Sequence, residues 1–136
     1  MSHPSICGVL IAVIGVTIHA ASTAMALDDR RAKHELLELD PQSRLEQTCD
    51  TEVMLRITRD SNPFNVDKVI AYTFGEPIMG ENSIKAPGAV FRSSGNWYHL
   101  SYVCVTGPKH LDAHFLRYRI GAKIPRAQWA MHDLYD

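Results

Sequence analysis

The order of apolar and polar residues divides the chain into an uncharged leader and a patterned region that follows it. Residues 6–18 (ICGVLIAVIGVTI) are almost continuously apolar, and the first 26 residues contain no Asp, Glu, Lys or Arg. Ser22 and Thr23 restore polarity, and Ala24-Met25-Ala26 has the small-x-small pattern that signal peptidases cleave. This pattern predicts a cleavable secretory signal peptide over residues 1–26 and a mature chain over residues 27–136.

The alternative is an uncleaved membrane anchor, because the uncharged stretch approaches the roughly 20 residues that span a bilayer. The strongly apolar part is 13 residues long and a cleavage pattern follows it, which favours removal. We therefore expect a periplasmic or secreted protein without stable membrane insertion after cleavage.

Helical periodicity follows in residues 41–59, where Leu45, Cys49, Val53 and Ile57 recur at every fourth position. Such spacing places one apolar stripe on a helix. Asp40 is suited to cap this helix, and Pro41 to occupy its first turn. The charged residues 27–39 predict a short, frayed helix or arm in front of it.

Four segments rich in β-branched and aromatic residues predict strands over residues 68–74, 89–93, 97–106 and 110–120. Ser94-Gly95-Asn96 is a hairpin turn signal, and the many Gly and Pro residues of 76–88 predict an exposed loop. Pro125 is placed to begin a last helical turn that docks Trp129 and Leu134 onto the domain. The order predicts a single α+β domain in which one long helix packs on a curled antiparallel sheet of about four strands, a roll loosely like cystatin or NTF2.

The mature chain keeps two cysteines, and an even pair in an exported protein is typical of a disulfide. Cys49 lies on the apolar stripe of the predicted helix. Cys104 shares the apolar face of its strand with Leu100 and Tyr102. We therefore predict a Cys49–Cys104 bond that joins helix to sheet and closes the domain over residues 27–136.

The charge balance of the chain argues against nucleic acid as a partner. The chain has 14 Lys and Arg against 15 Asp and Glu, and the predicted leader contains none of them. A net charge of −1 gives no overall attraction to nucleic acid. Arg117, Arg119, Lys123 and Arg126 form a local basic cluster, for which a solvated strand edge is the simpler interpretation.

His110, Asp112 and His114 are the first candidates for chemistry, as ligands of a metal ion. On a strand all three point to one face, but the two histidines then lie about 13 Å apart, too far for one zinc ion with its short bonds to nitrogen. We therefore predict no metal at these residues. The sequence also lacks phosphate-loop, nucleotide-binding and zinc-protease motifs, so we expect no cofactor.

A candidate binding face lies opposite Cys104 on the predicted sheet, and we assign to it Trp97, His99, Ser101, Arg117 and Arg119. Trp and Tyr are favoured anchors in interfaces when they are exposed. Ser101 lacks the glycine-rich elbow and the oxyanion donors of a serine nucleophile. On the predicted helix, Glu46 and Asp50 are spaced to pair as carboxylates, although salt bridges with neighbouring arginines explain such spacing more simply.

Several segments together resemble a known family. They are residues 39–50 (LDPQSRLEQTCD), 69–72 (VIAY), 89–92 (AVFR), 95–101 (GNWYHLS), Ile120-Gly121, Ile124-Pro125 and Trp129. This set resembles the domain of unknown function number 930 over nearly the whole mature chain. The resemblance implies an exported bacterial envelope domain, and it implies no activity and no catalytic residues.

Three functional hypotheses follow, one of which is a secreted effector that acts on a host. The first is a non-enzymatic binding or structural module of the cell envelope that contacts a protein or peptide through one sheet face. The alternative is a small hydrolase or lyase whose pocket contains His99, His110 or His114 together with Asp112.

Overall fold

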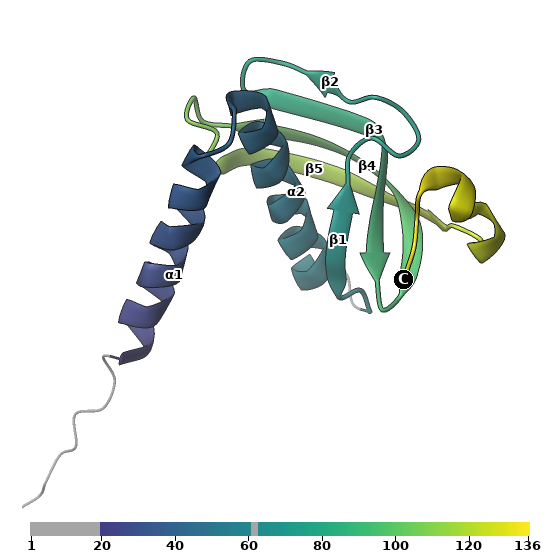
Figure 1. Cartoon of the computed structure of the whole chain (residues 1–136), viewed down its shortest axis with the longest axis horizontal. Coiled ribbons are helices and arrows are strands. Elements are labelled where there is room, and N and C mark those ends of the chain that lie inside the picture. Colours follow the sequence, from purple (N-terminus) through teal and green to yellow (C-terminus); the bar gives the residue numbers. More distant parts are fainter. Residues whose placement is uncertain (1–19, 61–62) are drawn as a thin grey trace, which may run out of the picture.

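The computed structural model describes residues 20–60 and 63–136 (Figure 1). The predicted signal peptide therefore lies largely outside the described residues. The first helix, α1 (Ala20–Leu37), is longer than the predicted arm, and it projects away from the sheet. No helix among the described residues is both long and apolar enough to cross a bilayer.

The side chain of Arg44 contacts the C-terminal end of α1. Its guanidinium donates to the carbonyl oxygens of Leu36, Leu37 and Leu39 at 2.9, 3.2 and 2.8 Å. The last carbonyls of a helix have no partner within the helix, so this side chain caps the end of α1.

The second helix, α2 (Pro41–Asp60), has the predicted start and the predicted apolar stripe. Asp40 Oδ1 accepts hydrogen bonds from the backbone N–H groups of Gln42 and Ser43, both at 3.1 Å. The four stripe residues at positions 45, 49, 53 and 57 are all buried against the sheet.

The strands form one antiparallel sheet in the order β1-β3-β4-β5, with β2 paired to β3 as well. They are β1 (Val66–Ile70), β2 (Ile78–Met79), β3 (Ser83–Ser93), β4 (Asn96–Thr106) and β5 (Ala113–Lys123). The turn between β3 and β4 has two residues, Ser94 and Gly95, with φ of 48° and 72°. Two successive positive φ angles produce the tight hairpin that the predicted turn signal requires.

The structure corrects the prediction of an exposed loop over residues 76–88. This segment contains β2 and the first half of β3, and the register of β3 against β4 shifts between Ala86 and Ala89. The residues inside that shift are Pro87 and Gly88, which a β-bulge accommodates without ending the strand.

Two other strands also differ from the prediction at both ends: the first is Val66–Ile70 where residues 68–74 were predicted, and the last is Ala113–Lys123 where residues 110–120 were predicted. The first strand ends at Ile70, where the chain leaves the sheet. The chain returns to the sheet at Phe74, whose backbone N–H donates to the Gly88 carbonyl at 2.8 Å. The last strand is Ala113–Lys123, since residues 107–112 form a turn.

Apolar residues are buried on both faces of the sheet. The inner face, which includes Leu100, Tyr102 and Cys104, packs against α2. On the opposite, outer face, a smaller cluster of Val90, Trp97, Ile124, Trp129 and Leu134 is formed with the C-terminal segment. Docking of Trp129 and Leu134, 5% and 4% exposed, confirms the predicted helical turn, which consists of two 3-10 turns, Arg126–Gln128 and Ala130–His132. The α+β class is confirmed, with five strands.

Candidate functional site: an acidic cleft and a basic sheet face

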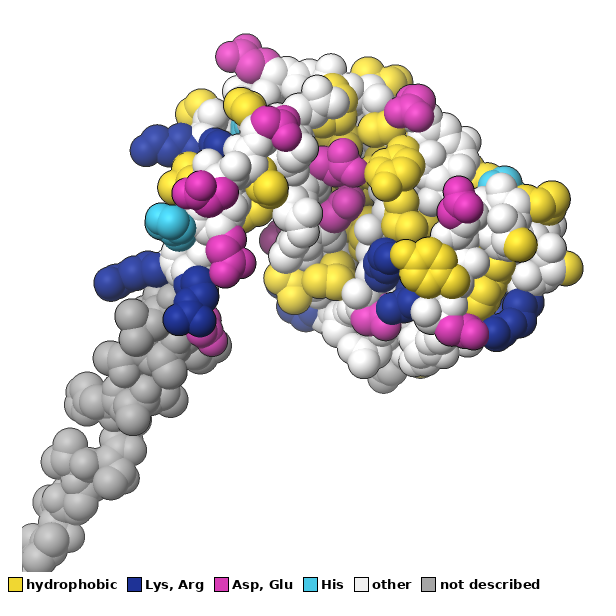
Figure 2. Space-filling view, in the orientation of Figure 1, with side chains coloured by type: hydrophobic (Ala, Val, Ile, Leu, Met, Phe, Trp, Pro, Cys, Tyr) yellow, Lys and Arg dark blue, Asp and Glu magenta, His cyan; other side chains and the backbone are white. Residues whose placement is uncertain are grey.

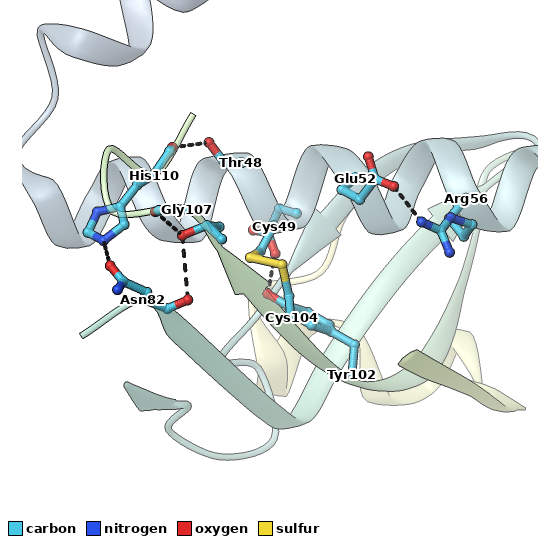
Figure 3. Close-up of a disulfide and its surroundings, with 11 residues drawn as sticks. Thr48, Cys49, Glu52, Arg56, Asn82, Tyr102, Cys104, Gly107 and His110 are labelled. Carbon is cyan, nitrogen blue, oxygen red and sulfur yellow. Dashed lines mark hydrogen bonds and ion pairs between the residues drawn. A yellow bond between two sulfur atoms is a disulfide. The ribbon is translucent and has the colours of Figure 1, made fainter. Parts of the chain in front are cut away.

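A disulfide connects the middle of α2 to β4 (Figure 3). The sulfur atoms of Cys49 and Cys104 are 2.00 Å apart, and both residues are fully buried. Because the bond joins the apolar stripe of the helix to the inner face of the sheet, it fixes the side chains next to it on both elements.

Asp50 and Tyr102 are such neighbours, and they form a hydrogen bond across the same junction. The Tyr102 hydroxyl donates to Asp50 Oδ1 at 2.6 Å. Burial raises the pKa of Asp50 to about 7, although the hydrogen bond from Tyr102 favours the charged form. Burial, together with the charge of Asp50, raises the pKa of Tyr102 and keeps its hydroxyl protonated.

A cleft of about 550 Å³ opens beside Asp50. Its walls include Glu46 from α2, Lys68 from β1 and Tyr135 near the C-terminus. Burial and the negative charge of Glu76 raise the pKa of Glu46. Figure 2 shows acidic side chains gathered over the middle of this face, between α2 and β1.

The charged side chains that line this cleft can exchange protons and bind groups of opposite charge. Asp50 is poised to change protonation near neutral pH, as a general acid or base requires. Its hydrogen-bond partner in the described part of the chain is Tyr102, which is a donor and not an activated nucleophile. Lys68 is held at the far wall, with Nζ 3.1 Å from the Tyr135 hydroxyl.

The outer face of the sheet has the opposite charge. Cross-strand pairing places Ile78, Lys85, Val103 and Arg117 in one row over β2, β3, β4 and β5. The neighbouring rows contain Ser83, Val105 and Phe115 on one side, and Ser101 and Arg119 on the other. Lys85, Arg117 and Arg119 are exposed, and so are Ile78 at 62% and Phe115 at 48%. The surface formed by Ile78, Lys85, Val103, Phe115, Arg117 and Arg119 is called the basic face below.

The arginines of the basic face differ from the other arginines that follow α1. Of the seven arginines between residues 40 and 136, five bind a carboxylate or a carbonyl: Arg44, Arg56, Arg59, Arg92 and Arg126. Arg117 and Arg119 have no such partner among the described residues, and neither has Lys85. The face therefore has three positive charges that the described domain does not neutralise.

The other residues of the predicted binding face have different surroundings. Trp97 is fully buried under the C-terminal segment, and its Nε1 donates to the Tyr135 carbonyl at 2.9 Å. The ring of His99 lies against Phe74, with the ring centroids 4.5 Å apart. Ser101 is half-buried beside Arg119. Trp97 therefore offers no surface to a partner, whereas Arg117 and Arg119 belong to the basic face and Ser101 lies next to it, paired with Arg119.

The structure does not bring His110, Asp112 and His114 together as a site. The His110 ring is buried between segments, with Nδ1 2.8 Å from the Pro41 carbonyl and Nε2 2.9 Å from the Glu81 carbonyl. Figure 3 shows the His110 ring hydrogen-bonded to the Asn82 side chain, and the His110 backbone carbonyl accepting a hydrogen bond from the Thr48 hydroxyl. Asp112 pairs with Lys33 at 3.5 Å, and His114 is exposed. Among residues 20–60 and 63–136, no three His, Cys, Asp or Glu side chains are grouped to hold a metal ion.

These features define a disulfide-closed α+β domain that has an acidic cleft on one side and a basic sheet face on the other. The chain belongs to the family described as Domain of Unknown Function (DUF930), whose model matches residues 36–134. The match begins at the end of α1 and covers α2, all five strands and the C-terminal turns. No curated protein and no solved structure matches the chain.

Sequence reasoning missed two features of these sites. Lys85 is absent from the predicted binding face because the Gly and Pro residues of its segment predict a loop. The alternation of Ser83 and Lys85 with the apolar Ile84 and Ala86 is the signal that could have placed it on a strand. The hydrogen bond between Asp50 and Tyr102 joins two residues 52 positions apart, and no local sequence pattern predicts it.

Proposed function

We propose that this protein is an exported, non-enzymatic binding module that holds an acidic protein or peptide of the cell envelope on its basic face. The observation that carries the proposal is the contrast among the arginines. Among the seven arginines that follow α1, Arg117 and Arg119 are exposed and have no carboxylate or carbonyl partner in the described part of the chain, while each of the other five has one.

The surroundings of these charges support contact with a macromolecule. Phe115 and Ile78 are large apolar side chains left about half exposed beside the three cations. Interfaces combine apolar and aromatic anchors with charged groups that select the partner. In the sheet beneath, the disulfide joins β4 to α2, and the C-terminal cluster covers the end of the outer face that includes Trp97.

Export is supported by the leader and by the disulfide. Disulfides persist in oxidising compartments and are rare in the cytosol. The uncharged leader with its cleavage pattern provides the route to such a compartment.

Site-specific photo-crosslinking in the cells that produce the protein tests the proposal. Benzoylphenylalanine replaces Phe115 on the basic face, and in a matched control it replaces Leu55, which is 57% exposed on α2. We expect an adduct at position 115 whose crosslinked segment is acidic. The Arg117→Glu/Arg119→Glu change should abolish that adduct. Equal adducts at both positions, or an adduct indifferent to the charge reversal, would contradict the proposed face.

The cleft favours a second candidate, a hydrolase or lyase in which Asp50 exchanges a proton. The raised pKa of Asp50 is the observation in its favour. Screening a panel of ester, peptide and glycoside substrates with the wild type and the Asp50→Asn variant separates the two functions. A turnover that the substitution abolishes would establish the enzyme, whereas the binding function predicts none.

A further inference from the structure

The last strand, β5, is the end of the sheet. It pairs with β4 along Tyr98–Thr106, and the strand order stops there. It is 11 residues long, and no backbone hydrogen bond to its other edge occurs among the described residues. A strand edge of this length presents alternate N–H and C=O groups that an added strand can bind.

The inner side of this edge is apolar and incompletely covered. Leu116, Tyr118 and Ile120 pair with Cys104, Tyr102 and Leu100 in the core, yet all three are only partly buried. Residues of the core at the sheet's centre, by contrast, are almost fully buried. An apolar side chain next to β5 would therefore extend the core layer beneath α2.

The outer side of the same edge is positive. Arg117 and Arg119 alternate with the apolar positions, so they point to the opposite face. A strand lying beside β5 would place every second side chain next to these arginines. Cross-strand neighbours of opposite charge stabilise the pairing, and like charges oppose it.

This pattern argues against a second copy of the chain as the occupant. Two β5 strands paired edge to edge in antiparallel register would bring two pairs of arginines together on one face. Charged residues on edge strands are a common means of preventing such self-association. The charge complementarity instead selects a strand whose outward residues are acidic.

We propose that an extended segment of the partner, with alternating apolar and acidic residues, adds to the edge of β5 that faces away from β4, as a further antiparallel or parallel strand. Its apolar residues face Leu116 and Ile120, and its acidic residues face Arg117 and Arg119. This inference rests on the proposed function and specifies the form of the acidic partner.

The probe is a seven-residue peptide of alternating Glu and Val with blocked ends. In edge pairing, only one of its two sets of N–H groups points toward β5. Two matched peptides, methylated on the backbone nitrogens of all Val residues or of all internal Glu residues, have the same charge and side chains. We expect one methylated peptide to lose affinity by roughly tenfold or more while the other stays within about threefold of the parent.

Hydrogen exchange followed by NMR provides the second readout. The parent peptide should slow exchange about tenfold at alternate amides of β5 and leave β1 unchanged. Two methylated peptides that both bind like the parent would overturn strand addition, while charge-dependent binding would leave the basic face intact as the proposed function. Absence of binding by the parent, or a dimer of the wild-type protein formed through β5 in sedimentation, would also overturn it.

Discussion

Replacement of Asp50 by Asn should change how the stability of the domain depends on pH. The ordinary pKa of an aspartate side chain is 3.8, and that of Asp50 in the folded protein is raised to about 7 by burial. Between these two values the folded state binds a proton that the unfolded state has released. Stability is therefore fully present below about pH 4 and is lost as the pH rises toward 7.

The size of the effect follows from the difference of about 3 pKa units, at about 1.4 kcal/mol each, which gives roughly 4 kcal/mol. A small domain has a free energy of unfolding of about 5–15 kcal/mol, so this one group matters. Asn keeps the acceptor oxygen for Tyr102 and cannot ionise. We expect the Asp50→Asn variant to gain stability relative to the wild type as the pH rises, by about 4 kcal/mol between pH 4 and pH 8.

Urea unfolding of both proteins at half-unit pH steps measures this quantity, because subtracting the two curves cancels the titrating groups that do not interact with Asp50. Tyr102→Phe is the matched control: it removes a hydrogen bond that favours the charged carboxylate. The loss of stability should then extend to a higher pH than in the wild type. A difference between the Asp50→Asn variant and the wild type that stays within 1 kcal/mol across the range would refute this account of the buried carboxylate.

Three further predictions concern the scaffold. Replacing Cys49 and Cys104 together by Ala opens a loop with a sequence separation of 55 residues. The domain should lose about 4 kcal/mol and melt at least 10 °C lower in calorimetry, and an unchanged melting temperature would refute a stabilising bond. Trp129→Ala should lower the free energy of unfolding in urea by about 3–5 kcal/mol, because it leaves a cavity in the cluster on the outer face. A decrease below 1 kcal/mol would show that the C-terminal turns are not docked. Gly88→Ala should prevent the return of the chain to β3, since its added carbon would lie 2.4 Å from the backbone of Phe74 and Gly75. NMR spectra that keep the wild-type β3 shifts in this variant would contradict that packing.

The sequence predicted the features that have a local cause. The four-residue spacing of the stripe from Leu45 to Ile57 places it on one side of a helix, and Asp40 and Pro41 determine where that helix begins. Alternation in residues 97–106 placed Cys104 on the inner face and Ser101 on the outer one. These two assignments supported the disulfide that an even pair of cysteines in an exported protein predicts.

The features that depend on tertiary context were not predictable in the same way. Pro87 and Gly88 ordinarily end a strand, and only the bulge of β3 against β4 reconciles them with an extended sheet. Trp97 has the alternation of an outward residue, but the C-terminal segment returns to bury it. Its burial thus depends on residues more than 25 positions later in the chain.

A charge-swap binding measurement tests the role of the basic face most directly. Calorimetric titrations compare the wild type with the Arg117→Glu/Arg119→Glu variant, each against a Glu-Val and a Lys-Val peptide of equal length. Two cross-strand charge pairs of about 0.5–1 kcal/mol each correspond to a preference of roughly 5- to 30-fold. The wild type should prefer the acidic peptide and the variant the basic one. If both proteins show the same preference, Arg117 and Arg119 do not select the ligand, and the assignment of this face is wrong.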